Sequence, residues 1–330
     1  MIILADIISA TIIFAIPLLL VALGGMYSER SGTINIALEG IMIIGALFAS
    51  LFLNLAEKAG WGAEQPQLAM LLAMLIGGIS GLIYSLLLAL ASVSLKADQT
   101  IGGTALNLFA PAFAIVLSWA IQGQGQTTIY TPTWIKITQA DFGLPVSKTP
   151  GFWEALIFKN FYLTTPVALL ILAVTVFLIY QTRFGLRLRS CGEHPQAADS
   201  VGINVYKIRY IGVAISGFLA GIGGLAFTIA AGSGFQSTVA GYGFFALAVM
   251  IFGNWNPIRI FGAAMFFALF KVIGSYSGSI PFLPSFSTIK YSQYLYQMLP
   301  YIVTMIILVF TSKKSRAPKA EGIPYDKGSR

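Results

Sequence analysis

The sequence is short of charge, cysteine and histidine, and each shortage argues against a class of protein. Charged residues make up 10% of the 330 residues, against about a quarter in an ordinary soluble domain. Cys191 is the single cysteine, so an internal disulfide cannot form, and with His194 as the single histidine a zinc site is disfavoured. The 57% share of hydrophobic residues excludes a disordered or collagen-like chain.

Apolar sequence without charge is abundant instead. The mean hydropathy is +0.81, and a soluble globule cannot bury that much apolar surface, so the solvent must be lipid. Seven charge-free windows can each hold a helix of about 20 residues: 7–28, 40–56, 65–95, 99–135, 160–182, 210–258 and 291–312. A Gly-rich polar break at 231–240 divides the sixth window, and a further span covers about 257–277.

These windows predict an all-α integral membrane protein with about nine membrane elements. The element at 241–252 is short enough to be a half-helix, which survives at membrane depth only under a cover of protein or a water-filled cavity. We expect a transmembrane domain over 1–312 and a basic tail over 313–330. The motif Ile-Ser-Gly recurs at 79–81 and 215–217 in helices of opposite predicted direction, which is faint support for an inverted repeat.

Positive charge predicts the orientation of the chain. The loop at 182–209, the tail, Arg30, Lys96 and Arg259 fall on the same side by counting spans, and that side is expected to be cytoplasmic. The N-terminus and the loop at 123–161 are then outside, and the C-terminus is inside. The net charge of +8 is interpreted as orientation signal and anionic-lipid contact, with no nucleic-acid partner.

The loop at 182–209 has the punctuation of a short helix over about 195–201. Pro195 suits the first helical position, Gly202 suits the C-terminal cap, and Asn204 can cap the helix that follows. Such a helix either docks in a groove of a soluble partner or is an ordinary re-entry loop, and the spacing alone favours neither.

Polar groups inside the spans are candidates for a translocation path, because lipid makes them costly. Asn35 and Glu39 share a helix face, and Thr104 and Asn107 lie on one stripe of the next-but-one span. Phe244 and Phe245, in the short element, are candidate aromatic residues of the same path. The alternative for the polar residues is hydrogen bonding between helices, at about 0.6 kcal/mol per pair.

Two further features of the sequence argue against an enzyme. No phosphate-binding loop of the form G-x-x-x-x-G-K-[ST] occurs, so this chain cannot hold ATP phosphates in such a loop, and no cofactor is expected in it. His194 lies in a loop predicted to be cytoplasmic, with no nucleophile and acid arranged around it. Lys271 either snorkels to the interface or lines an aqueous vestibule.

Several long motifs resemble the permease subunits of the ABC importers that handle ribose, branched-chain amino acids and nucleosides. They read RFGLRLR at 183–189, GEHPQAA at 192–198, GIN at 202–204 and SGFLAG at 216–221. Two others, ERSGTINIALEG at 29–40 and GYGFFALAVMIFGNWNP at 241–257, are similar to the nucleoside branch, which works with an extracytoplasmic lipoprotein.

The resemblance implies a function and a set of partners. It makes the loop helix the coupling helix of an ATPase partner, with the coupling residues Glu193, His194, Pro195, Ala197, Ala198 and Gly202. It also implies a second permease, expected to be a different chain, and a substrate-binding lipoprotein. We therefore expect a nucleoside importer subunit in the cell membrane; alternatives are a permease for a sugar or a branched-chain amino acid, and a secondary transporter.

Overall fold

The structure is a computed structural model that describes residues 2–143, 151–276 and 316–327, with residues 298, 299, 302, 303, 305, 306 and 309. Within these residues the regular elements are helices, and β-structure is limited to two isolated bridges, Ile129–Phe235 and Lys136–Tyr162. The prediction of an all-α fold is confirmed.

Seven helices are long and apolar enough to cross a membrane: α1 (Ile2–Arg30), α2 (Leu38–Lys58), α4 (Pro66–Ala89), α5 (Gln99–Gln122), α7 (Thr164–Gln181), α10 (Val205–Ala231) and α12 (Pro257–Tyr276). An eighth apolar helix, α11 (Tyr242–Phe252), has 11 residues and spans about 16 Å, half of the hydrocarbon core. The half-helix prediction is therefore confirmed. The ninth predicted element, at 291–312, falls mostly outside the described residues.

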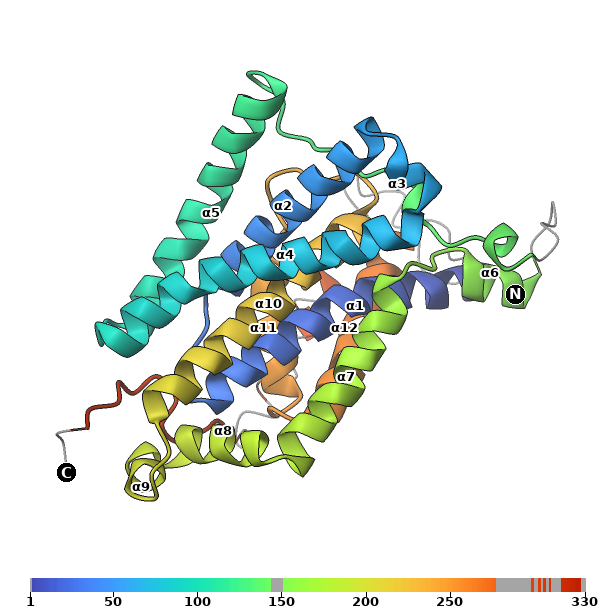
Figure 1. Cartoon of the computed structure of the whole chain (residues 1–330). Helices are drawn as coiled ribbons and strands as arrows, with labels where there is room; N and C mark the ends of the chain where they lie inside the picture. The colour runs from blue at the N-terminus through green and yellow to red at the C-terminus, as the bar shows by residue number, and fades with distance from the viewer. Residues whose placement is uncertain are drawn as a thin grey trace.

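Short elements mark the two ends of the bundle. Figure 1 shows α8 (Arg183–Glu193) and α9 (Pro195–Ser200) across one end, and α3 (Trp61–Glu64) and α6 (Phe152–Phe158) towards the other. The remaining pieces are a π-helical turn at Leu90–Ser94 and 3-10 turns at Thr133–Ile135 and Gln139–Phe142. We call the two ends the α8–α9 end and the α6 end.

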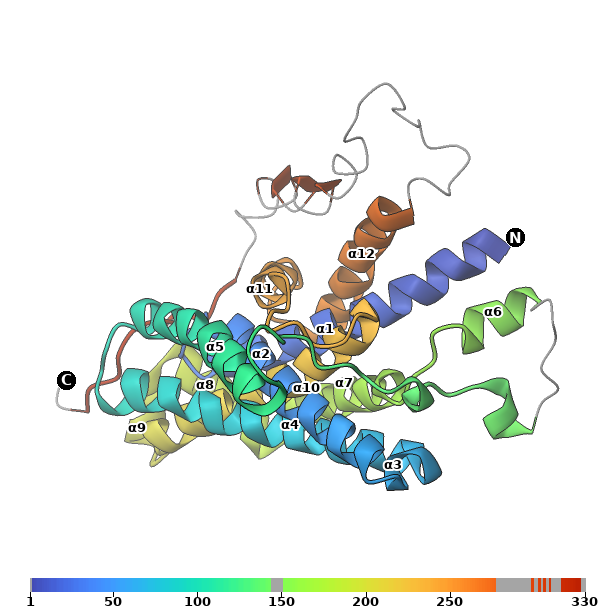
Figure 2. The same ribbon diagram turned by 90° about the horizontal axis from the view of Figure 1, so that it is seen from above.

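Ion pairs and hydrogen bonds confirm which segments share an end. Lys159 and Asp6 form a salt bridge of 2.6 Å, so the N-terminal helix and the loop at 123–161 meet at the α6 end. Arg30 hydrogen-bonds to the turn after α11, and residues 316–327 run along the α8–α9 end, drawn in red in Figures 1 and 2. Arg30 and the described cations of the tail, Arg316 and Lys319, therefore lie towards the α8–α9 end, as predicted.

The helix ends at the loop over 182–209 are those that the sequence predicts. Pro195 begins α9, and Gly202 has φ +84° and donates its N–H to the carbonyl of Asp199. Asn204 Oδ1 accepts the N–H of Lys207 at 2.9 Å and caps α10. The sequence did not predict α8, which continues from Thr182 over the preceding half of the loop.

Three helices form the centre of the bundle. In the most apolar windows of α1, α2 and α10 the buried share is 78%, 72% and 78%, against 22% for α5 and 28% for α7. Figure 2 shows α5 at one edge of the helices and α6 projecting beyond the other. The apolar side chains on α5 and α7 therefore face lipid or a partner. Exposing apolar side chains to lipid has no free-energy cost, whereas exposing them to water would have one.

Glycines allow α2, α4 and α10 to approach backbone to backbone. A β-carbon on Gly221 would overlap the carbonyl oxygen of Gly77, and one on Gly81 would overlap that of Gly217. One on Gly45 would overlap the Cα of Gly221. The two Ile-Ser-Gly motifs therefore pack against each other across α4 and α10, while the inverted repeat itself stays a prediction.

The close contact predicts a selective effect of one methyl group. We expect Gly221→Ala to lower the free energy of unfolding by about 1–3 kcal/mol, because rigid backbone atoms have to move apart. Gly262→Ala is the matched control, since nothing lies within 4 Å of its β-carbon position in α12. Thermal unfolding in detergent checks this, and equal melting temperatures for the two variants would contradict it.

Candidate functional site

The chain is not helical between α1 and α2, although this segment is deeply buried. Ser31, Thr33 and Asn35 are each 0% exposed within residues 31–37. We call residues 31–37 the break. The N-terminus of α2 follows the break, and the N-terminus of the half-helix α11 lies beside it.

Glu39 joins these two helix starts. It lies in the first turn of α2, and its carboxylate accepts the N–H groups of Gly241 and Gly243 at 2.8 and 2.6 Å. Those amides open α11, so a negative side chain caps the positive end of the half-helix. The Glu39 side chain is buried, and both of its oxygens are used by this cap.

Asn107 holds the start of α2 from the opposite side. Its Oδ1 accepts the N–H of Gly40 at 2.7 Å, and its Nδ2 donates to the carbonyl of Ile36 at 2.8 Å. One amide side chain on α5 therefore satisfies a donor and an acceptor that helix α2 leaves open. A further hydrogen bond joins Ile34 N–H to Gln99 Oε1 at 2.7 Å. These bonds are what permits irregular backbone inside an apolar bundle.

Asn35 fastens the break to the central helix α10. Its Nδ2 donates to Ser216 Oγ at 2.8 Å, and both residues are fully buried. Asn35 Oδ1 has no hydrogen-bond partner in the described part of the chain. Thr33 Oγ1 in the break and Gln99 Nε2 beside it are likewise buried without a hydrogen-bond partner among the described residues.

Of the other predicted path residues, Thr104 and Phe244 are exposed and Phe245 is buried. Thr104 is exposed on α5 and bonds back to the carbonyl of Thr100 at 2.8 Å. Phe244 is 50% exposed on α11, whereas Phe245 is 8% exposed and packs its ring 5.3 Å from that of Phe267. The structure therefore brings Asn35, Glu39 and Asn107 together, and the lining of a path by any of the six stays a prediction.

Lys271 has an aromatic partner. Its Nζ lies 5.5 Å from the centre of the ring of Tyr242, which is the first residue of α11. This cation–π contact places the ammonium against the protein beside the start of the half-helix.

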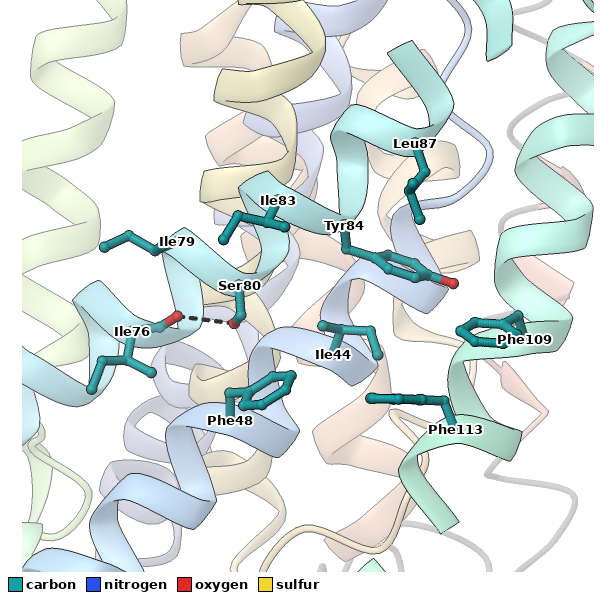
Figure 3. Close-up of a pocket in the computed structure, with 10 residues that line it drawn as sticks. All are labelled: Ile44, Phe48, Ile76, Ile79, Ser80, Ile83, Tyr84, Leu87, Phe109 and Phe113. Atoms are coloured by element: carbon teal, nitrogen blue, oxygen red, sulfur yellow. Dashed lines mark hydrogen bonds between the residues drawn. The ribbon is translucent and has the colours of Figure 1, made fainter. Parts of the chain in front are cut away.

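An apolar cavity of about 480 Å³ lies between α2, α4 and α5 (Figure 3). Its two hydroxyl groups are already bonded, Ser80 to the carbonyl of Ile76 at 2.9 Å and Tyr84 to that of Leu106 at 2.7 Å. The remaining side chains around it are Ile44, Phe48, Ile76, Ile79, Ile83, Leu87, Phe109 and Phe113. It offers no open hydrogen-bonding side chain to a polar solute.

A second hollow, of about 550 Å³, lies where α2 and α5 end away from the α8–α9 end. Its polar lining consists of Asn54, Lys58, Gln122, Thr128 and Tyr130. Unlike the apolar cavity, this hollow combines polar side chains with the apolar side chains of Leu51, Leu55 and Ile121.

The α8–α9 end presents only part of the predicted coupling set. Ala197 is exposed, as are Glu193, His194 and Gly202. Pro195 and Ala198 are buried against their own chain, Ala198 at 3% exposure. Val201, which the sequence reasoning missed as a surface residue, is 75% exposed beside Gly202. A partner meeting α9 would thus contact Ala197 and Val201 and not Ala198.

The turn after α11 is strained and clamped. Asn254 and Trp255 have φ values of +52° and +53°, which are unfavourable for a residue as bulky as tryptophan. Glu29 Oε2 accepts the indole N–H of Trp255 at 2.6 Å, and Arg30 donates twice to its carbonyl, at 2.9 and 2.7 Å. Glu29 and Arg30 both hydrogen-bond to this turn instead of pairing with each other.

Residues 316–327, which we call the strap, pack against the rest of the chain. A simple basic tail would instead lie free in solvent. The Ala320 N–H donates to the carbonyl of Gly192 in α8 at 2.8 Å, and Arg209 Nη1 donates to the carbonyl of Ile323 at 2.8 Å. Lys96 and Asp326 form a salt bridge of 3.0 Å. Burial raises the pKa of the Glu321 carboxyl to about 7, and a hydrogen bond with Glu29 opposes this rise.

The family of this chain follows from its sequence and agrees with the fold. Residues 7–308 match the family described as branched-chain amino acid transport system / permease component. The chain belongs to this permease family. It is therefore a multi-pass membrane component of a transport system and not an enzyme.

Three relatives cover most of the chain. It is 42% identical to the guanosine ABC transporter permease protein NupQ of Bacillus subtilis (strain 168), over 99% of this chain and 98% of the relative. It is 38% identical to the nucleoside ABC transporter permease protein NupC of Lactococcus lactis subsp. cremoris (strain MG1363), over 97% and 96%. It is 24% identical to NupB, a nucleoside ABC transporter permease protein of the same strain, over 77% and 68%. No solved structure matches the chain.

The cap on α11 gives a direct prediction for Glu39. We expect Glu39→Ala to lower the free energy of unfolding by about 3 kcal/mol, because two buried N–H groups lose a charged acceptor. Glu57→Ala is the matched control, since Glu57 lies exposed on the same helix. Thermal unfolding in detergent is the measurement, and a Glu39→Ala variant as stable as the control would contradict the role of the cap.

Proposed function

We propose that the chain is a permease subunit of an ATP-driven importer of nucleosides. The observation that carries the proposal is the identity of 42% and 38% to two permeases named for guanosine and for nucleosides, across nearly the whole chain. The break and α11 lie within the two motifs that resemble the nucleoside branch. The family's description, branched-chain amino acid transport, supplies the alternative substrate class.

The proposed path passes the break at membrane depth, on the side where α5 and α11 are exposed. Thr104 and Phe244 reach outward from these helices, while Glu39 and Asn107 hold the backbone behind them. Substrate sites near the midplane of transporters are commonly formed where helices are interrupted. The hollow lined by Asn54 and Tyr130 would be the entry, on the outer side of the membrane.

The proposed importer has a second permease, and we infer that it is a different chain. The same Lactococcus strain has two nucleoside permeases, and this chain is 38% identical to one and 24% to the other. The low burial of α5 supports a partner surface there, since its exposed polar stripe would otherwise meet lipid.

The remaining partners follow from the ends of the bundle. We infer that the α8–α9 end is cytoplasmic, because its cations obey the positive-inside rule, and that the ATPase docks on α9. The C-terminus is then inside and the N-terminus outside. A binding lipoprotein would deliver the substrate to the α6 end.

Radiolabelled uptake tests the substrate. Cells carrying the full complex would be offered guanosine, uridine, ribose and leucine, with a strain lacking this chain as the control. We expect uptake of the nucleosides only. Uptake of ribose or leucine without nucleoside uptake would overturn the substrate class and leave the permease fold untouched.

The docking of the ATPase has its own test at α9. We expect Ala197→Glu to reduce uptake at least about tenfold and to reduce co-purification of the ATPase, because a buried charge without a partner opposes docking. Ala197→Ser is the matched control, since it keeps a small uncharged side chain at the same exposed position. Wild-type uptake and co-purification in Ala197→Glu would show that α9 is only a connector.

A further inference from the structure

The contacts of the strap are not explained by the proposed function. The strap touches the α8–α9 end, the turn after α11 and the break, three regions that are far apart in the sequence. Its polar contacts include backbone atoms, which fix its position more firmly than side-chain contacts on a mobile tail would.

One end of the strap is bonded to the turn below the half-helix. The Arg316 N–H donates to Asn254 Oδ1 at 2.9 Å. Asn254 is one of the two strained residues of that turn, and its neighbour Trp255 is held by Glu29 and Arg30. The strap therefore supports a backbone conformation that local preference disfavours.

The middle of the strap is bonded to the unit formed by α8 and α9. The Ala320 N–H donates to the carbonyl of Gly192, one residue before the end of α8, and Pro318 and Ala320 are buried there. Glu321 follows directly and lies against Glu29. A displacement of α8 is thus carried to the strap through a backbone hydrogen bond.

The far end of the strap covers the break. The buried Arg209 guanidinium lies between the two segments. A β-carbon on Gly32 in the break would overlap it, and Arg209 Nη1 donates to the carbonyl of Ile323 in the strap. A β-carbon on Gly322 would lie 2.8 Å from Ile34 Cδ1, so strap and break are in contact here. Tyr325 is buried with its ring 5.3 Å from that of Tyr206 in α10.

We propose that the strap is a coupling element, which transmits movement of the α8–α9 unit to the turn at Asn254–Trp255 and so to the half-helix α11. Ala320 and Asn254 are its positioning residues. The connection runs through three hydrogen bonds: Gly192 with Ala320, Arg316 with Asn254, and Gly241 at the start of α11 with Glu39. The proposal rests on the proposed function in one respect, that the ATPase acts on α9.

Two alanine-to-proline substitutions within the strap test the proposal. Ala320→Pro removes the N–H that bonds Gly192, whereas Ala317→Pro changes an exposed residue whose N–H has no hydrogen bond in the described part of the chain. We expect Ala320→Pro to lower nucleoside uptake at least about tenfold while the ATPase still co-purifies and hydrolyses ATP. Ala317→Pro should stay within about twofold of wild type.

The second connection is tested at Asn254. Asn254→Gly keeps a residue that tolerates positive φ and removes the acceptor of the Arg316 N–H, whereas Asn254→Asp keeps the acceptor. We expect Asn254→Gly to raise the number of ATP molecules hydrolysed per nucleoside imported in proteoliposomes, and Asn254→Asp to leave it near the wild-type ratio. A merely stabilising contact would lower the amount of complex without changing this ratio.

Three outcomes would overturn the proposal. The first is equal uptake by Ala320→Pro and Ala317→Pro, and the second is an unchanged ATP ratio in Asn254→Gly. The third is loss of the ATPase from Ala320→Pro, which would make the strap part of the docking surface. Failure of the proposed function looks different, because wild-type complex would then import no nucleoside, and the ATP ratio would be measured with the substrate that it does import.

Discussion

The structure depends on one charged cap inside an apolar bundle. The half-helix α11 begins with amides that have no partner within their own helix, and the Glu39 carboxylate accepts two of them. Asn107 Oδ1 likewise accepts the N–H of Gly40, in the first turn of α2. These bonds satisfy backbone groups at both helix starts and at Ile36, and they hold an irregular segment among the central helices. The bond to Gly241 also joins α2 to a segment 202 residues away and fixes where α11 begins.

A rigid centre surrounds this joint. The glycine contacts of α2, α4 and α10 remove side chains from their shared interface, so these helices meet through backbone atoms that cannot rearrange. α5 is attached to the centre by few contacts, among them the amide of Asn107. The fold therefore combines a fixed frame with a peripheral helix and a half-helix whose ends are held by single side chains. That is a suitable division for a permease, which has to open a path without losing its fold.

The α8–α9 end adds a second layer of connections. Glu29 and Arg30 hold the strained turn after α11, and the strap bonds both this turn and α8. Movement at this end would reach α11 through its last residues, while Glu39 holds its first. The half-helix is thus contacted from both directions, by residues of the α8–α9 end and by Glu39 beside the break.

Local patterns in the sequence determined the helices, the family and the helix ends. Charge-free windows predicted the spans and the short α11, and Pro195, Gly202 and Asn204 marked α9 and the start of α10, because these signals act within one turn of a helix. The tertiary structure decided what each polar residue does. Glu39 and Asn107 were predicted to share a region, yet their partners are backbone groups that no periodicity reveals. Ala198 faces inward and Ala197 outward, and the tail is a strap, because burial and docking depend on neighbours from distant parts of the chain.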